Sequence, residues 1–256
     1  MLEDALLGAL IAFCLSAIST PVGVSGAVFL VPVQVSILHT PNPAVTPTNL
    51  LYNLIAIPGA LLRFHSEGRL GGRLLWLLSL GTLPGVIAGA VIRVELLSGP
   101  EAFLAVIAVV LIPLGVWLLL GQPAPVPEQG DQRGLIVTLS LAVGTVGGIY
   151  GIGGGSILAP VLVGLGYTVR EVAPAALTAT FLTSIVGVAT FGVLSINAGG
   201  DIAADWMVGI ALGLGGLVGG FLGARFQERV PERTLRRALG LLALGLGIRY
   251  GIVSLA

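Results

Sequence analysis

Long apolar segments, interrupted by glycine, proline and charged residues, dominate the chain. No charged side chain occurs between Asp4 and Arg63, and similar charge-free segments follow at 74–92, 102–127, 134–169, 172–200 and 206–224. Such lengths are typical of membrane-spanning α-helices rather than of barrel strands, in which apolar and polar residues alternate. The interruptions predict ten helical elements, at roughly 4–20, 24–39, 44–64, 73–93, 101–121, 134–149, 152–166, 172–196, 206–226 and 233–254. The pattern predicts an all-α polytopic membrane protein.

Composition agrees with this prediction. Of the residues, 55% are hydrophobic and 9% are charged, and the mean hydropathy is +1.04, values that a soluble domain with a polar exterior does not reach. Twelve arginines balance twelve acids, and no basic patch indicates a nucleic-acid partner. The single Cys14 excludes an internal disulfide, and His39 and His65 show no metal-ligand spacing. The expected partners are the lipid bilayer and a small solute, with no cofactor and no metal.

Two glycine-rich segments divide the chain into related halves. The segment Gly23-Val-Ser-Gly-Ala-Val-Phe-Leu-Val-Pro32 recurs 128 positions later as Gly151-Ile-Gly-Gly-Gly-Ser-Ile-Leu-Ala-Pro160. We expect a first transmembrane repeat at 1–121, a polar, proline-rich linker at 122–133 and a second transmembrane repeat at 134–256. A helix interruption that recurs in each half is where a transporter is expected to bind its substrate.

The positions of the arginines indicate how the halves are oriented. With five elements per half, one side of the membrane holds most of them, namely Arg63, Arg69, Arg73, Arg133, Arg170, Arg225, Arg229, Arg233, Arg236 and Arg237. Merging the first two elements of each half instead gives eight crossings and parallel halves, and it scatters the arginines over both faces. The positive-inside rule therefore favours inverted halves, with a cytoplasmic linker and both termini outside.

The first two elements of each half are about 16 residues long, against the roughly 20 residues that a full span needs. They are either tilted spans or a re-entrant hairpin whose tip, at 20–26 or 147–156, lies near the membrane centre. The glycine runs favour the hairpin, because unpaired backbone groups inside a membrane are tolerated only where they line a polar cavity.

Several short motifs occur in a distinctive order. They are Gly151-Ile-Gly-Gly-Gly-Ser156 with Leu158-Ala-Pro160, the degenerate partner at 23–32, the Thr48-Asn49 element at 44–49 and the glycine-to-tryptophan loops at 68–76 and 200–206. In these features the chain resembles the sulfite exporter TauE/SafE family. The resemblance implies a bacterial-type plasma-membrane carrier that exports small sulfur-containing anions such as sulfite, sulfoacetate or related organosulfonates. The first motif has fewer glycines than the second, so the two half-sites are expected to differ.

The candidate binding residues surround the two glycine-rich segments. Helices that open there present unpaired N–H groups and the positive end of a helix dipole to a small anion, and glycine lets the backbone approach it. Nearby hydroxyls and amides, Thr183 among them, complete a polar ring. The predicted substrate-binding residues are Ser25, Gly26, Asn49, Asn53, Gly153, Gly154, Gly155, Ser156, Thr180 and Ser184.

Other interpretations stay open at this point. Membrane glycines often serve helix packing, which we expect of Gly81, Gly85 and Gly89 and of Gly215, Gly219 and Gly223. Asn49 with Asn53, and Thr180 with Ser184, form polar pairs on single helix faces, and such pairs form hydrogen bonds between helices as readily as to a ligand. No ionisable residue lies in the spans, which favours uniport or a co-ion held by carbonyls and hydroxyls.

The leading function is a secondary anion exporter that works by alternating access. An anion channel and a carrier of another small carboxylate are the alternatives. A serine hydrolase at Ser156 is disfavoured because no histidine base lies nearby, so no catalytic residue is expected. The oligomeric state is open, with a homodimer among the options.

Overall fold

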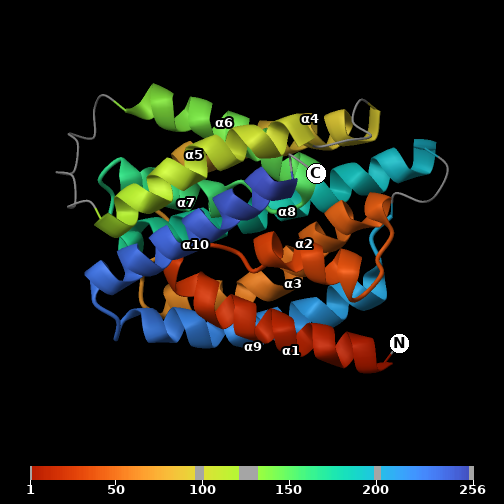
Figure 1. The fold of residues 1–256 in the computed structure, drawn as a ribbon, viewed down its shortest axis with the longest axis horizontal. Helices are drawn as coiled ribbons and strands as arrows, with labels where there is room; N and C mark the ends of the chain where they lie inside the picture. Colours follow the sequence, from red (N-terminus) through yellow and green to blue (C-terminus); the bar gives the residue numbers. More distant parts are fainter. Residues whose placement is uncertain (1, 96–100, 121–131, 199–202, 254–256) are drawn as a thin grey trace.

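A computed structural model describes residues 2–95, 101–120, 132–198 and 203–253, and in these ranges all regular structure is helical (Figure 1). All ten predicted elements are present within a few residues of their expected bounds, which confirms the all-α prediction. The helices are α1 (Leu2–Ser19), α2 (Ala27–Ser36), α3 (Asn42–Ser66), α4 (Arg73–Glu95), α5 (Glu101–Leu120), α6 (Arg133–Tyr150), α7 (Gly155–Gly164), α8 (Val169–Ala198), α9 (Trp206–Gln227) and α10 (Glu232–Val253), with a 3-10 turn η1 (Thr20–Val22) after α1. Most of the proposed linker lies outside the described residues.

The helices differ in length and in apolar character. Within the described ranges, six are long and apolar enough to cross a bilayer, namely α1, α3, α4, α6, α8 and α9. Helices α2 and α7 have ten residues each, and at 1.5 Å per residue each covers about half of a 30 Å hydrocarbon core. The prediction of equal lengths within each pair is therefore wrong, because α1 and α6 have 18 residues each. The uncharged residues directly after Gly23 and Gly151 are not helical, which the hydropathy pattern does not reveal.

Left-handed glycines form the two breaks. Gly23 has a φ of 80° and donates its N–H to the Thr20 carbonyl at 3.0 Å, and Gly151 ends α6 with a φ of 69°. Residue Leu38, which follows α2, lies against Gly8 near the start of α1, so α1 and α2 form a hairpin. The Gln227 side chain at the end of α9 donates to the Pro21 carbonyl at 2.5 Å. Pro21, in the tip of this hairpin, therefore lies at the end of α9, whereas the depth of the tip in the membrane stays a prediction.

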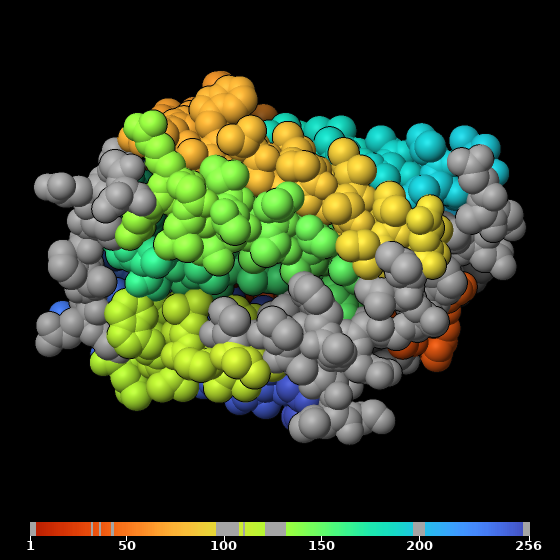
Figure 2. Space-filling model, turned by 90° about the horizontal axis from the view of Figure 1, so that it is seen from above, coloured from red at the N-terminus to blue at the C-terminus, as the bar shows by residue number. Residues whose placement is uncertain are grey.

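Helices of the two halves interleave. Helix α1 packs on α9 and α4 packs on α6, while α3 and α8 pack on each other and on α9 and α4, respectively. Helices α1, α3 and α9 run in one direction, and α4, α6 and α8 run in the other (Figure 1). Figure 2 shows α6, in green, directly against α4, in orange to yellow, across one face of the molecule.

Glycine seams explain the close approach of α1 to α9 and of α4 to α6. A Cβ atom added at any seam position lies within 3.0 Å of the backbone of the partner helix; at Gly85, for example, it lies 2.6 Å from the Leu141 carbonyl oxygen. The prediction that these glycines serve helix packing is confirmed. The seam residues are Gly81, Gly85 and Gly89 on α4 and Gly215, Gly219 and Gly223 on α9.

Arginines gather at one end of the bundle, as the loop parity predicts. Arg63, at the end of α3, pairs with Glu228 at 2.9 Å, and Arg170, at the start of α8, donates to the Val230 carbonyl at 3.0 Å. The backbone N–H of Val169 donates to Glu232 at 2.5 Å. These contacts join the ends of α3, α8, α9 and α10.

Candidate functional site

The two helix breaks touch at the centre of the molecule. The backbone N–H of Ser25 donates to the Ser156 hydroxyl oxygen at 3.0 Å, and both residues are almost completely buried. The Ser156 hydroxyl in turn donates to the Ile152 carbonyl at 3.3 Å. A backbone donor of one half thus meets a side-chain acceptor of the other, 131 positions apart in the chain.

Helix α3 supplies two buried amides beside this contact. The Ser25 hydroxyl donates to Asn53 Oδ1, whereas Asn53 Nδ2 has no hydrogen-bond partner among the described residues. Asn49, one turn earlier, accepts from Gln34 Nε2 at 2.5 Å and donates to the Ala27 carbonyl at 3.3 Å. Asn49 is therefore engaged in holding α2 on α3. The buried Nδ2 of Asn53 has no acceptor within the described part of the chain, and an unpaired buried donor lowers the stability of the fold unless a ligand binds it.

The space around Gly26 is nearly filled. A Cβ atom added there collides with the Tyr52 hydroxyl, whose oxygen lies 2.5 Å from Ser16 Oγ. A cavity of about 10 Å³, lined by Ser25, Gly26 and Tyr52 among others, remains. This volume holds about one water molecule and no sulfonate, so the centre is closed in this conformation.

The glycines of the second break pack against α8 and α4. A Cβ atom on Gly155 lies 2.5 Å from the Thr180 hydroxyl, and one on Gly154 lies 2.8 Å from Thr82 Cγ2. Gly153 has a φ of 68° and faces Thr180 as well. The Thr180 hydroxyl is fully buried and has no hydrogen-bond partner among the described residues. In the closed conformation, protein atoms occupy the positions at which we expected a ligand to approach these glycines.

Two further predicted residues bond within their own helix. Ser184 donates to the Thr180 carbonyl at 2.8 Å, and Thr183 donates to the Ala179 carbonyl at 3.0 Å. Hydroxyls in helices commonly make such bonds, which leave them little capacity for a ligand. The structure therefore brings Ser25, Asn53 and Ser156 together and places Ser184 outside this group; its contact with substrate stays a prediction.

Sequence reasoning missed four residues that complete the central cluster. They are Ser16, Gln34, Thr46 and Tyr52. Gln34 is completely buried in an apolar helix, so the argument that selected Asn49 and Asn53, that a buried amide must face the protein interior, also applies to it. Thr46 donates to the Ile149 carbonyl at 3.0 Å and ties α3 to the second break.

The chemistry of this cluster is that of neutral hydrogen-bond donors. Its polar groups are hydroxyls, amides and the backbone N–H groups of helix starts, which can coordinate an anion without a fixed positive charge. Among the described residues, no three His, Cys, Asp or Glu side chains are grouped as metal ligands. The described part of this cluster therefore offers neutral hydrogen-bonding groups and no set of metal ligands.

Comparison with known proteins agrees with this description. The family model for "Sulfite exporter TauE/SafE" matches residues 8–250. A "Probable membrane transporter protein" of Xylella fastidiosa (strain 9a5c) is 26% identical, over 94% of this chain and 91% of that protein. "Probable membrane transporter protein YunE" of Bacillus subtilis (strain 168) is 29% identical, over 48% of this chain and 44% of that protein. No solved structure matches the chain significantly. The chain belongs to the sulfite exporter TauE/SafE family of membrane transporters.

Proposed function

We propose that this protein is a secondary transporter that exports small sulfur-containing anions, such as sulfite or an organosulfonate, by alternating access. The observation that carries the proposal is the hydrogen bond from Ser25 to Ser156 between the two helix breaks, beside the unpartnered amide of Asn53. Two half-helices meet there in a buried polar cluster, which is the arrangement that carriers use for small anions. The family membership supports sulfite-like substrates.

The proposal includes an inverted repeat, which the helix packing supports. The contact of α1 with α9 corresponds to that of α6 with α4, and the contact of α3 with α9 corresponds to that of α8 with α4. In both pairs of contacts the equivalent helices run in opposite directions (Figure 1). Helices α3 and α8 are equivalent in the two halves and pack antiparallel, as do α5 and α10. This is expected for equivalent helices that a two-fold axis relates. Each half-helix therefore approaches the centre from its own side.

The closed centre supports a carrier rather than an open pore. An anion cannot pass through a cavity of about 10 Å³. Transport therefore requires the helices around the centre to move. The arginine-rich end faces the cytoplasm in this proposal, by the positive-inside rule, which places both termini outside. The inside-negative membrane potential then drives anions outward without an ionisable residue in the spans.

Flux measurements on purified protein in proteoliposomes test this function. We expect saturable sulfite efflux that decreases about tenfold in both Asn53→Ala and Ser156→Ala, because a hydrogen bond to a charged ligand contributes roughly 1.5–3 kcal/mol. Ser195→Ala is the matched control, since this partly buried hydroxyl donates to the Gly192 carbonyl of its own helix. We expect this variant to transport at the wild-type rate.

Two results would contradict the proposal. Wild-type efflux rates in both Asn53→Ala and Ser156→Ala, with each variant monodisperse in detergent, would show that the central cluster does not bind the substrate. A current that rises linearly with sulfite concentration and never saturates would identify a channel instead. Sulfoacetate and acetate, tested as competitors, separate a sulfonate carrier from a carboxylate carrier.

A further inference from the structure

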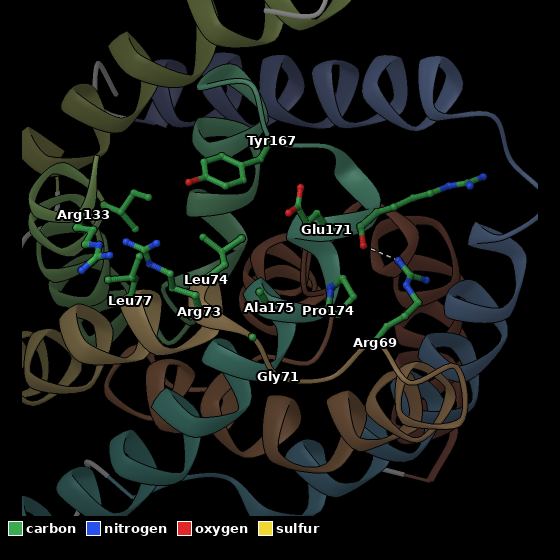
Figure 3. Close-up of a pocket in the computed structure, with 13 residues that line it drawn as sticks. Arg69, Gly71, Arg73, Leu74, Leu77, Arg133, Tyr167, Glu171, Pro174 and Ala175 are labelled. Carbon is green, nitrogen blue, oxygen red and sulfur yellow. Dashed lines mark hydrogen bonds between the residues drawn. The ribbon is translucent and has the colours of Figure 1, made fainter. Parts of the chain in front are cut away.

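A second polar cavity lies at the arginine-rich end, away from the central cluster. It has a volume of about 360 Å³, within the roughly 300–1,000 Å³ range of small-molecule pockets. The starts of α4, α6 and α8 and the segments just before α4 and α8 enclose it (Figure 3). Its charged lining consists of four arginines and one acid, namely Arg69, Arg73, Arg133, Arg170 and Glu171. We call it the arginine cavity.

Two of these arginines are already engaged. Arg69 pairs with Glu67 at 2.9 Å, donates to the Arg170 carbonyl at 2.5 Å and lies over the Phe64 ring. Arg170 donates to backbone carbonyls of the segment that joins α9 to α10. Both residues therefore stabilise the end of the bundle, and their guanidinium groups already have partners within the protein.

The other two arginines differ. No described residue forms a hydrogen bond or an ion pair with the guanidinium group of Arg73 or Arg133. In Figure 3 the two side chains lie on the same side of the cavity, while Glu171 lies nearer to Arg69. Each is the first residue of its helix, and α4 and α6 run parallel, so two positive helix ends add to the two charges. Two like charges on the same side of a cavity repel each other, and an anion between them relieves the repulsion.

A neutral donor completes the cavity. Tyr167, in the segment between α7 and α8, points its hydroxyl toward the side that holds Arg73 and Arg133 (Figure 3). Partial burial, together with the charge of Glu171, raises the pKa of Tyr167, so the phenol stays protonated and can donate a hydrogen bond. Gly71 and Gly72 leave this region open, because no atom lies within 4 Å of a Cβ added at either position.

We propose that the arginine cavity is a binding site for a small divalent or sulfonated oxyanion, which Arg73 and Arg133 bind together, with Tyr167 as a third donor. Guanidinium groups bind such oxygens in bidentate geometry. If the protein exports anions as proposed above, this cavity is where they are captured before they enter the closed centre. The site itself does not depend on transport.

Calorimetric titration of the full-length protein in detergent with sodium sulfate and with sulfoacetate, at low ionic strength, tests the site. We expect saturable binding that weakens about tenfold in Arg73→Gln and in Arg133→Gln, because each loses a charge-assisted hydrogen bond. Arg237→Gln is the matched control: this exposed arginine lies outside the cavity, and its replacement changes the net charge equally. Added sodium chloride should weaken the binding by screening.

The outcomes separate this site from the central one. Retained sulfate binding in Asn53→Ala supports a distinct site, even if export itself is absent. Equal weakening by Arg237→Gln and Arg73→Gln would overturn the proposal in favour of diffuse charge attraction, and so would wild-type affinity in an Arg73→Gln/Arg133→Gln double variant. The phosphate group of a lipid headgroup offers arginine the same anionic oxygens as a sulfate or a sulfonate. If short-chain phosphatidylglycerol binds through these arginines while free sulfate does not, the site belongs to a lipid and the proposal is wrong.

Discussion

Replacing Gly151 with alanine is expected to abolish folding of the transport-competent protein. The φ of 69° at this position costs an L-residue about 1–2 kcal/mol. In addition, the new Cβ collides with the Thr46 carbonyl oxygen and lies 3.0 Å from Asn49 Cβ. Both atoms belong to α3, so the substitution pushes the second break away from the helix that carries the central amides. Thermal unfolding in detergent and sulfite efflux measure the two consequences.

Gly68→Ala is the matched control for this prediction. Gly68 has a φ of 67°, so the conformational cost is the same, but a Cβ added there meets nothing within 4 Å. We expect a small loss of stability and normal efflux in this variant. If both variants lose the same amount of stability, the left-handed backbone alone explains the effect, and the close packing of the break against α3 contributes nothing.

The second large effect is expected at the seam between α4 and α6. In Gly85→Ala the added methyl lies 2.6 Å from the Leu141 carbonyl oxygen and 2.8 Å from the Thr145 nitrogen. Two rigid helix backbones must separate to admit it, and overpacking of this kind costs about 1–3 kcal/mol. We expect a clearly lower midpoint of thermal unfolding and a lower yield of monodisperse protein.

Gly192→Ala, on α8, controls for the residue change itself. No atom lies within 4 Å of a Cβ added at Gly192, so the change should be neutral or slightly stabilising, since alanine favours the helix more than glycine does. Equal unfolding midpoints for Gly85→Ala and wild type would show that the two helices are not in direct contact at this position.

The elements of the fold could be predicted because charge and proline mark their ends. Arg73 begins α4 and Glu232 begins α10, both close to the expected positions. The starts of α2 and α7 were predicted three residues early, because the residues after Gly23 and Gly151 carry no charge or proline that would separate them from the helices that follow. Hydropathy reports burial and not backbone conformation, so it cannot distinguish an apolar turn from an apolar helix.

The candidate site was predicted in part, for a similar reason. Ser25, Asn53 and Ser156 stand out because each polar side chain interrupts an apolar segment, and the structure brings these three together. Ser184 has the same pattern but satisfies its hydroxyl within α8. Whether a polar side chain reaches another helix or bonds within its own helix depends on its rotamer and on the neighbouring helices. Sequence spacing alone encodes neither of these. The arginine cavity is assembled from three separated helix starts and could not be read from any one segment.

The interleaving of the helices has a consequence for how the molecule moves. Because α1 packs on α9 and α4 packs on α6 through glycine backbones, the bodies that move in the proposed alternating access are not the amino-terminal and carboxy-terminal halves. In this proposal one body contains α1, α3 and α9, and the other contains α4, α6 and α8. A protease cut between α5 and α6 would therefore leave two fragments that still migrate together until a denaturant pulls them apart.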